Sequence, residues 1–509
     1  MIKESIIIVK TGRRRAVRVS EPAANSVEVC IIGYGPTGAT LASLLGLTGI
    51  STVVIERQAA PYDLPRAVQF DDEVMRVFQT IGLADKIALS THVSPGMLFK
   101  DREGRLLVDW SRPMEIGPQG WHRSYRFHQP ELEGILRDGI SRFPNVAVRS
   151  CREFLDATQD DEGVTVRMRN LTTGELESLR CSYLVGADGA RSSIREMIGT
   201  DWNDLNFNQN WLVVDVCLQR DMPELGDHSV QYCEPERPAT YVRGTGQRRR
   251  WEFALLPEEN PEAMAAPDAV WARLARWINP ADAVLERVAN YTFRAVINRQ
   301  WRQGRLLIAG DAAHLTPPFM GQGLCAGIRD AANLGWKLIR VVRGQSSAAL
   351  LDSYGAERIP HVTAYIAQAV RLGEVINTCA LESLASAAPA PQGGLRLATI
   401  APSLGPGLAA GWTAPAHRIA PQPTLATGLR ADDAAGYGFA LFARPGLPVP
   451  PAGHLTVIRD AAVQPWLDEL GAEAAMIRPD RYVLGAARDH GELENLLAAI
   501  APSSSLGAC

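Results

Sequence analysis

Residues 304–325 read GRLLIAGDAAHLTPPFMGQGLC, and this stretch decides which fold the chain can adopt. A short apolar strand, residues 306–309, ends at a tight Gly310-Asp311 step. The Pro317-Pro318 pair then forbids further regular structure, because proline lacks a backbone N–H donor. A Gly-Gln-Gly loop at residues 321–323 opens a helical pattern. This order of strand, acid, proline pair and glycine loop brings backbone against a flat, polar ligand.

The helix that follows this loop is expected to be long and packed along one face. Its N-terminus, fixed by Gly321 and Gly323, can stabilise negative charge by about 0.3 to 2 kcal/mol. Such a site suits a reduced flavin, whose pyrimidine ring carries an anion. The apolar residues that recur at helical spacing are Leu324, Ile328, Ala331, Leu334, Leu338 and Val342.

A second motif, Gly33-Tyr34-Gly35-Pro36-Thr37-Gly38, follows an apolar strand and opens a helix. In a dinucleotide fold Gly33 permits the tight turn, Gly35 lets backbone approach a pyrophosphate, and Gly38 lets helix and strand pack closely. The helix N-terminus supplies oriented N–H groups. Glu56 ends the next strand, where it would accept hydrogen bonds from an adenosine ribose. A structural turn is the alternative, but the strand and helix on either side favour binding.

A third motif is Asp188-Gly189, which also follows an apolar strand, at residues 183–187. Arg191 comes next, and Ser193 and Glu196 have the spacing of a capping box for another helix. A capped helix start with no ligand explains this motif equally well. All three motif strands are nevertheless expected to lie in one sheet.

Length and composition describe an ordinary globular protein with small-molecule chemistry. The 509 residues exceed one core, so two or three domains are expected. Hydrophobic residues make up 46% and charged residues 21% of the chain. The net charge of -4 and the pI near 6.2 provide no basic surface for nucleic acid. No apolar run approaches the roughly 20 residues of a membrane span.

The cysteines lack the spacing of a zinc site, so no metal is expected. Free thiols in a reducing cytoplasm are the simplest interpretation. Residues 1–26, in which most basic residues follow the apolar run, are interpreted as a flexible N-terminal arm or an upstream start and not as a signal peptide. The eight cysteines are Cys30, Cys151, Cys181, Cys217, Cys233, Cys325, Cys379 and Cys509.

Residues 201–298 contain short β-type runs with turn residues between them, which predicts an inserted, mainly antiparallel sheet. Its aromatic strands suit the wall of a substrate pocket. Tyr232 and Tyr241 are the candidates to accept a hydrogen bond or proton there, although ordinary sheet packing explains either residue as well. His314 is expected to brace its loop.

The three motifs together resemble those of the single-component FAD-dependent aromatic hydroxylases, the group of p-hydroxybenzoate and phenol hydroxylases. The similarity is closest to the 3-(3-hydroxyphenyl)propionate hydroxylase branch, through runs such as residues 65–68, 211–216, 231–235 and 250–253. It covers about residues 27–380 strongly. The C-terminal part is loosely similar to the thioredoxin-like tail of such enzymes, without a cysteine pair.

The resemblance implies an α/β protein in which a Rossmann-like FAD-binding domain carries an inserted, mainly antiparallel β-sheet substrate domain and a small thioredoxin-like C-terminal domain. The predicted division is an arm at 1–26, the FAD-binding domain at 27–200 and 299–384, the substrate domain at 201–298, a Pro/Ala/Gly-rich junction at 385–451, and the thioredoxin-like domain at 452–509.

The resemblance also implies roles for residues along an extended FAD molecule. Glu56 would hold the adenosine ribose, with Arg57 beside it. Arg66 and Gln129 would contact the pyrophosphate and ribityl region. Asp311 would hold a ribityl hydroxyl group.

At the flavin end, the resemblance places Pro317 beside the isoalloxazine ring. The backbone of Gly323-Leu324-Cys325 would face the pyrimidine edge, with the Cys325 thiol taking no chemical part. Asp188 and Arg191 belong to a motif that such enzymes use near both FAD and the nicotinamide cofactor.

The implied reaction uses NADPH or NADH to reduce FAD, after which O2 adds to the reduced flavin and the resulting C4a-hydroperoxide hydroxylates a phenolic ring. The protein must orient the ring and exclude water. A tailoring hydroxylase of polyketide-like natural products and a non-catalytic FAD-binding protein stay open as alternatives. A homodimer is compatible with the resemblance.

Overall fold

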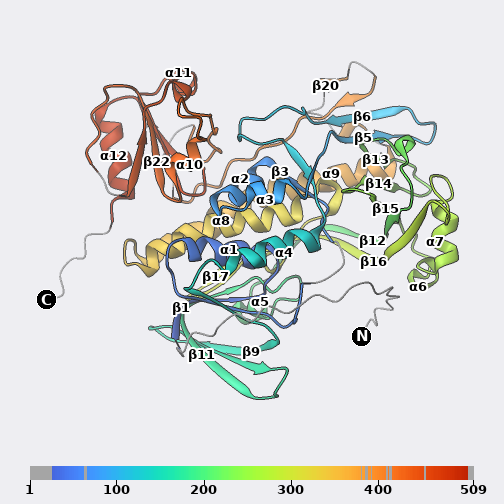
Figure 1. The fold of residues 1–509 in the computed structure, drawn as a ribbon, viewed down its shortest axis with the longest axis horizontal. Coiled ribbons are helices and arrows are strands. Elements are labelled where there is room, and N and C mark those ends of the chain that lie inside the picture. Colours follow the sequence, from blue (N-terminus) through green and yellow to red (C-terminus); the bar gives the residue numbers. More distant parts are fainter. Residues whose placement is uncertain are drawn as a thin grey trace.

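The computed structural model consists of two large sheets, a set of long central helices and a small separate unit near the C-terminus (Figure 1). The predicted arm at residues 1–26 lies outside the described residues, apart from Ser26, which begins the first strand. The described residues are 26–61, 66–379, 381–383, 388–390, 393–408, 411, 415–451 and 454–502.

An eight-stranded sheet forms the core of the nucleotide-binding part, and its central strands run parallel. Where they pair in parallel, these strands are mostly apolar and buried, as expected of strands that are covered on both faces. The three strands that carry the sequence motifs, β1, β11 and β18, are direct neighbours, which confirms the prediction that they share one sheet. In spatial order the main strands are β17 (Arg302–Gln303), β18 (Leu306–Ile308), β11 (Leu176–Gly186), β1 (Ser26–Ile32), β2 (Thr52–Ile55) and β8 (Val146–Arg149).

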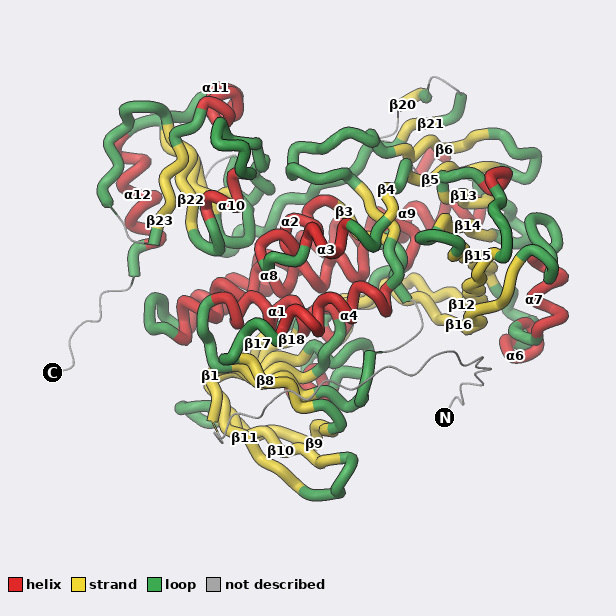
Figure 2. The backbone as a smooth tube through the Cα atoms, viewed as in Figure 1, coloured by secondary structure: helices red, strands yellow, loops and turns green. Residues whose placement is uncertain are grey.

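Three helices lie together on one face of this sheet (Figure 2). They are α1 (Pro36–Leu47), α4 (Gln129–Ile140) and α8 (Gln322–Val342). α8 is buried along most of its length, as its apolar spacing predicts. α9 (Asp352–Thr378) packs beside it, and α2 (Asp72–Thr80) packs against α8 as well. A shorter helix, α5 (Ser193–Ile198), follows β11.

A ten-stranded, mainly antiparallel sheet forms the second large layer. Its centre confirms the sheet predicted from residues 201–298, but strands from outside that range join its edge. Pairing between segments so far apart in the chain leaves no local pattern, so the predicted range is too narrow. The central strands are β12 (Trp202–Leu218), β13 (Ser229–Tyr232), β14 (Ala239–Arg243), β15 (Arg248–Ala254) and β16 (Ala283–Asn298), and the added strands include β5 (Gly96–Lys100) and β6 (Leu106–Ser111).

A three-stranded sheet completes the part of the molecule that surrounds the site. Its strands are β3 (Gln69–Asp71), β7 (Ser124–Arg126) and β4 (His92–Val93). β7 lies in the middle and pairs antiparallel with both neighbours. Its three residues are all buried, so β7 points its side chains into the protein interior.

The C-terminal unit contains a four-stranded sheet with its own apolar core. This unit begins earlier than residue 452, because the fully buried strand FALFA at 439–443 lies within the predicted junction 385–451. The Pro/Ala/Gly-rich composition of that segment obscures one short strand. In spatial order the strands are β23 (Leu455–Ile458), β22 (Phe439–Ala443), β24 (Ala474–Ile477) and β25 (Val483–Ala487).

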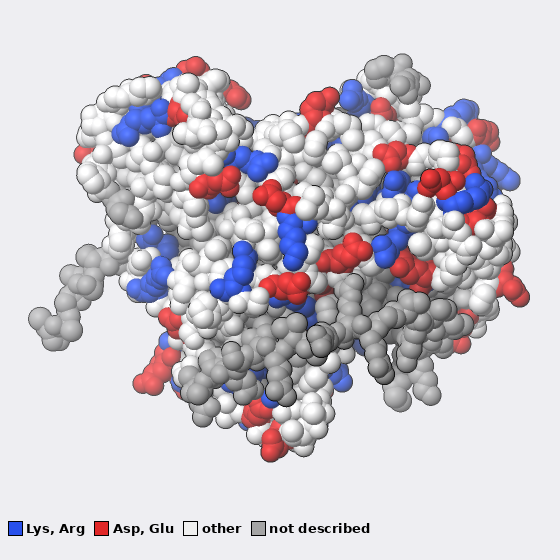
Figure 3. Space-filling view, viewed as in Figure 1, with Lys and Arg blue, Asp and Glu red and all other residues white. Residues whose placement is uncertain are grey.

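Positive and negative side chains are interspersed over the face of the molecule that Figure 3 shows. Within the described part of the chain, no helix combines the length and the apolar character needed to cross a membrane.

Candidate active site

The carboxyl ends of parallel strands bring the sequence motifs to one edge of the first sheet. β1, β2, β11 and β18 end in register with their neighbours. Gly33, Glu56, Asp188 and Gly310 follow these strand ends within two residues. In open α/β sheets, ligands bind in the crevice outside such strand ends.

The three glycines of the first motif have distinct surroundings. Gly33 has φ +101°, and a Cβ there would lie 2.3 Å from the Ala187 carbonyl oxygen. A Cβ on Gly38 would lie 2.1 Å from the Gly33 oxygen. A Cβ on Gly35 would meet no described atom within 4 Å. Gly33 and Gly38 are therefore required by packing, whereas Gly35 leaves open the space that a pyrophosphate would approach.

The N-terminus of α1 is available to a phosphate. Among the described residues no side chain caps this helix, and Pro36 occupies its first turn. Thr37 does not face outward: a Cβ on Gly310 would come within 2.7 Å of the Thr37 hydroxyl oxygen. Thr37 thus packs the first motif directly against the third.

Glu56 holds the turn after β1 in addition to its expected ribose contact. Its carboxylate accepts hydrogen bonds from the backbone N–H of Tyr34 at 2.8 Å and of Gln58 at 2.7 Å. Acceptor capacity is left, since a carboxylate has about four lone-pair sites. Arg57 is largely exposed and lies 3.5 Å from Glu153, so in this structure it turns toward β9 (Arg152–Gln159).

Gln129 is buried and supports the segment that carries Arg66. Its Oε1 accepts from the backbone N–H of Arg66 at 3.1 Å and of Ala67 at 2.7 Å, and its Nε2 donates to Glu133. The exposed Arg66 side chain borders the main cavity. Gln129 therefore positions Arg66, and its own side chain is already occupied.

Asp188 caps α5 from outside. Its Oδ2 accepts from the Ser193 N–H at 2.8 Å, while Oδ1 is buried with no hydrogen-bond partner among the described residues. Desolvation raises the pKa of this carboxyl. The true N-cap is Ser192, whose hydroxyl accepts from the Arg195 N–H, so the predicted capping box of Ser193 and Glu196 is wrong by one residue. Arg191 is exposed.

Asp311 follows β18 at the same edge. Its side chain is exposed toward the crevice, yet the surrounding protein removes enough water to raise the pKa of the carboxyl, against the opposing charges of His314 and Arg66. Gly310 has φ +64° and donates its N–H to Asp330 Oδ2 at 3.0 Å. The same oxygen lies 2.7 Å from His314 Nε2, which confirms that His314 braces the loop.

The N-terminus of α8 presents backbone to the cavity. Gly321 has φ +63°, and a Cβ on Gly323 would meet no described atom within 4 Å. Leu324 also lines the cavity. The Cys325 thiol instead faces the Gly321 carbonyl oxygen at 3.5 Å, and burial raises its pKa well above the usual range. This thiol therefore stays protonated and does not face the cavity.

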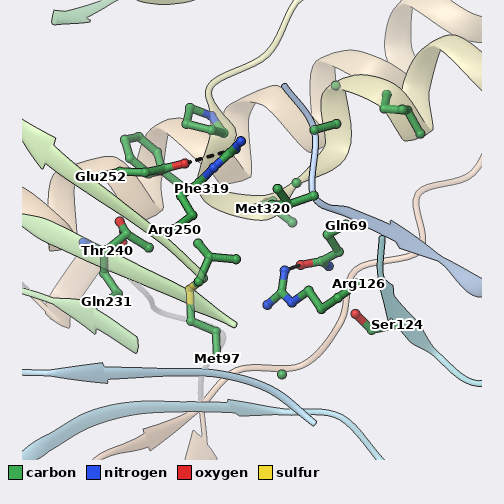
Figure 4. Close-up of a pocket in the computed structure, with 18 of the residues that line it drawn as sticks. Gln69, Met97, Ser124, Arg126, Gln231, Thr240, Arg250, Glu252, Phe319 and Met320 are labelled. Carbon is green, nitrogen blue, oxygen red and sulfur yellow. Dashed lines mark hydrogen bonds and ion pairs between the residues drawn. The ribbon is translucent and has the colours of Figure 1, made fainter. Parts of the chain in front are cut away.

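The main cavity lies between the second sheet, the short strand β7 and the loop before α8 (Figure 4). Its volume is about 160 Å³. Pro318 borders this cavity, whereas Pro317 is buried and does not border it; the place of Pro317 beside an isoalloxazine ring stays a prediction. Other residues on its wall are Gln69, Met97, Trp110, Arg112, Ser124, Arg126, Gln231, Thr240, Val242, Arg250, Glu252, Thr316, Phe319 and Met320.

Tyr232 and Tyr241 do not border this cavity. They project from the opposite face of the sheet into an apolar cluster with Trp251 and Trp277. The Tyr232 hydroxyl oxygen accepts from Trp277 Nε1 at 2.9 Å, and the Tyr241 hydroxyl is buried without a partner among the described residues. Side chains alternate between the faces of a strand, so the cavity receives their neighbours instead.

Sequence reasoning missed the polar residues on the cavity side of this sheet. Gln231, Thr240, Arg250 and Glu252 occupy alternate positions of β13, β14 and β15, and all four are buried. Buried polar side chains are exceptional, so polar residues alternating with aromatic ones in these strands were the available signal. The sequence around Arg126 contains no such alternating pattern, because its strand has only three residues.

Positive charge dominates the cavity. Burial lowers the pKa of Arg126 to about 10 and that of Arg112 to about 10, so both are still cations at neutral pH. Arg126 donates to Gln69 at 2.6 Å and to Ser229 at 2.7 Å, and its Nε has no partner among the described residues. Across the cavity, desolvation raises the pKa of Glu252, which lies 3.7 Å from Arg250.

The fold and the sheet edge define a dinucleotide-binding flavoprotein, and the N-terminus of α8 joins that edge to the main cavity. The N-termini of α1 and α8, which no described side chain caps, suit a pyrophosphate and an anionic flavin ring. The open space at Gly35 and the exposed Asp311 carboxyl fit an extended FAD.

Comparison with known sequences agrees with the assignment as a flavoprotein. The profile of the family described as "FAD binding domain" matches residues 26–369. A probable NADH-specific resorcinol 4-hydroxylase of Rhodococcus jostii is 38% identical, over 94% of this chain and 96% of that protein. A 3-(3-hydroxy-phenyl)propionate/3-hydroxycinnamic acid hydroxylase of Burkholderia cenocepacia is 38% identical over 69% of this chain, and the match spans 64% of that protein's length.

The chain therefore belongs to the FAD-binding-domain family, and it is a flavin-dependent aromatic hydroxylase. Among solved structures, the flavin-dependent monooxygenase PieE in complex with FAD and substrate superimposes with a TM-score of 0.76 at 20% identity, covering 94% of this chain and 99% of PieE. That likeness concerns the fold alone.

Proposed function

We propose that this hydroxylase uses NADH and O2 to hydroxylate a single-ring phenol of the resorcinol type. The proposal is based on the Arg126 guanidinium, which projects into a small cavity of about 160 Å³ that the N-terminus of α8 also borders. A cavity of roughly 150 Å³ accommodates benzene. The relative described as a probable NADH-specific resorcinol 4-hydroxylase matches over nearly its whole length. Its description supports a single-ring substrate and NADH as the reductant.

Arg126 is proposed to bind the phenol oxygen. Gln69 and Ser229 each accept one N–H of a terminal nitrogen, and each terminal nitrogen has a second N–H that is proposed to bind the ligand. The positive charges of Arg126 and Arg112 favour a phenolate, which is the more reactive form of the ring. Glu252 on the opposite wall is proposed to accept a proton or hydrogen bond from a second ring hydroxyl.

When bound along the sheet edge, FAD would supply the redox chemistry of the reaction. Glu56, the α1 N-terminus, Asp311 and the backbone of residues 321–324 would hold it. Pro318, Phe319 and Met320 cover the adjacent end of the cavity and exclude water. Asp188 and Arg191 are proposed to lie near the nicotinamide.

The C-terminal unit is proposed to be thioredoxin-like. Its strand order β23-β22-β24-β25, with only β22 and β23 parallel, supports this. Between residues 380 and 508 the sequence has no cysteine, so a redox role is not proposed. The seven described cysteines are unpaired, which supports a cytoplasmic location.

Anaerobic mixing of the FAD-loaded protein with NADH or NADPH, with and without resorcinol, tests the proposal. We expect NADH to reduce the flavin faster than NADPH and resorcinol to accelerate that reduction. A reduction rate that no single-ring phenol changes would reject the proposed substrate class. Acceleration only by multi-ring phenols would favour the natural-product tailoring alternative.

A further inference from the structure

One hydroxyl group of the C-terminal unit, that of Tyr482, contacts two helices of the nucleotide-binding part. The Tyr482 side chain is only 4% exposed. Its oxygen lies 3.1 Å from His361 Nε2 in α9 and 2.8 Å from Glu73 Oε1 in α2. Each contact begins a buried chain of hydrogen bonds that leads to the cofactor edge.

The first chain reaches the loop that carries Asp311. Arg358 Nη1 lies 2.7 Å from His361 Nδ1, and Arg358 Nε donates to Asp330 Oδ1 at 2.8 Å. The other oxygen of Asp330 accepts the Gly310 N–H. Asp330 and Arg358 are fully buried, so water does not compete for these contacts.

The second chain reaches the start of α8. Glu73 Oε2 accepts from Arg329 Nε at 2.6 Å, and Arg329 Nη1 donates to Gln322 Oε1 at 3.0 Å. Gln322 is the first residue of α8 and follows Gly321 directly. Two segments are expected to contact the flavin: the loop after β18 and the start of α8. Both are therefore connected to Tyr482 by hydrogen bonds.

Chemistry fixes the direction of every hydrogen bond in these chains. Arginine only donates and carboxylates only accept. His361 Nδ1 must therefore accept from Arg358, so Nε2 carries the proton and donates to the Tyr482 oxygen, whose own proton goes to Glu73. Burial, with Arg358 and Arg329 nearby, holds the pKa of His361 well below its usual range, which agrees with this neutral form.

We infer that Tyr482 is a positioning residue of the cofactor site: its hydroxyl holds Gly310-Asp311 through one chain and the Gly321-Gln322 turn through the other. The C-terminal unit would then set how tightly FAD fits, without touching it. The inference rests on FAD binding and is independent of the proposed phenol and of the preference for NADH.

The Tyr482→Phe variant of the full-length protein tests this role, since it removes one oxygen and leaves the ring. Buried networks of this kind modulate coupling by amounts that correspond to roughly 2- to 30-fold in affinity. We expect FAD to bind the Tyr482→Phe apoprotein more weakly within that range, with altered fluorescence and visible spectrum of the bound flavin. Tyr437→Phe is the matched control, because its hydroxyl is buried in the same unit without a partner among the described residues. It should leave both readouts unchanged.

Glu73→Gln alters the acceptor of the same Tyr482 hydrogen bond. It provides a second test if Tyr482→Phe folds poorly. In a double-mutant cycle, the effects of Tyr482→Phe and Glu73→Gln on FAD affinity should be non-additive, whereas Tyr482→Phe and Tyr437→Phe should add. A Tyr482→Phe protein with the parent's FAD affinity and flavin spectrum would overturn the inference. A parent that binds no FAD would overturn the flavoprotein assignment as well, whereas a failed phenol panel leaves this comparison intact.

Discussion

Arg126 is the residue on which substrate recognition is proposed to depend. Replacing it with glutamine removes a charged hydrogen-bond donor, a contact worth about 1.5 to 3 kcal/mol. We expect kcat/KM for the phenol to fall by roughly 10- to 150-fold, with FAD affinity unchanged. Tyr232→Phe, on the opposite face of the sheet, should keep kcat/KM within about twofold. Equal losses in the two variants, measured by steady-state kinetics, would contradict the assignment.

Asp72 makes stability depend on pH. Desolvation, with Asp71 and Glu73 nearby, raises the pKa of its carboxyl to about 7. The folded state therefore binds more protons than the unfolded state between pH of about 4 and 7, so this carboxyl lowers stability as pH rises through that window. Because the side chain is only half-buried, Asp72→Asn should stabilise the protein by about 1 to 2 kcal/mol at pH 8 and by much less at pH 4.

Urea unfolding at the two pH values measures this difference. Asp161→Asn, at an exposed position outside the helices and strands, serves as the control and should change stability equally at both. An Asp72→Asn protein whose stabilisation does not depend on pH would contradict the raised pKa.

At the residue level, the sequence was sufficient where geometry demands one residue type. Gly33 and Gly310 have positive φ at the turns that the motifs predict. It was insufficient for Tyr232 and Tyr241, because a shift of one residue along a strand changes which side chain enters the cavity. Those choices depend on packing between distant segments.

The turn from β1 into α1 allows binding and packing to be separated by two substitutions. A Cβ on Gly35 meets only open space, so Gly35→Ala should leave the stability of the apoprotein unchanged and weaken FAD binding by about tenfold or more, because the backbone can no longer approach the pyrophosphate. Gly38→Ala places a Cβ 2.1 Å from the Gly33 oxygen and should destabilise the apoprotein by about 1 to 3 kcal/mol.

Thermal unfolding of the apoprotein and FAD titration together check both variants. If Gly35→Ala destabilised the apoprotein as much as Gly38→Ala, the separate roles of the two glycines would be wrong.

Helices and strands whose apolar residues recur at regular spacing were predictable from the sequence. Strands that join a sheet by pairing with a distant segment were not. The spacing of Leu324 to Val342 predicts α8, which is found. β5 and β6 join the second sheet through a parallel contact between β5 and β13, and nothing local in either segment indicates it. β22 was hidden in a Pro/Ala/Gly-rich segment for a similar reason: composition averages over a single buried strand.

At the scale of the whole molecule, Arg478 holds the C-terminal unit on α9. Its two terminal nitrogens donate to Glu357 at 2.9 and 2.8 Å, and its Nε donates to Asp480 at 2.9 Å. All three side chains are nearly or fully buried. Arg478→Met leaves two buried carboxylates short of a partner and should cost about 3 to 5 kcal/mol.

Equilibrium unfolding measures this loss, and Arg444→Met, which breaks a more exposed pair with Asp468, should cost less than about 1 kcal/mol. Comparable losses in the two variants would contradict a structural role for the Arg478 cluster.

The most direct measurement of the central claim follows labelled oxygen. The FAD-loaded protein is supplied with NADH, resorcinol and isotopically labelled O2, and both hydroxylated product and hydrogen peroxide are quantified. We expect about one labelled oxygen atom in the aromatic product for each NADH consumed, with little peroxide. NADH consumption that ends entirely in peroxide for every single-ring phenol tested would contradict hydroxylation of such a ring in this cavity.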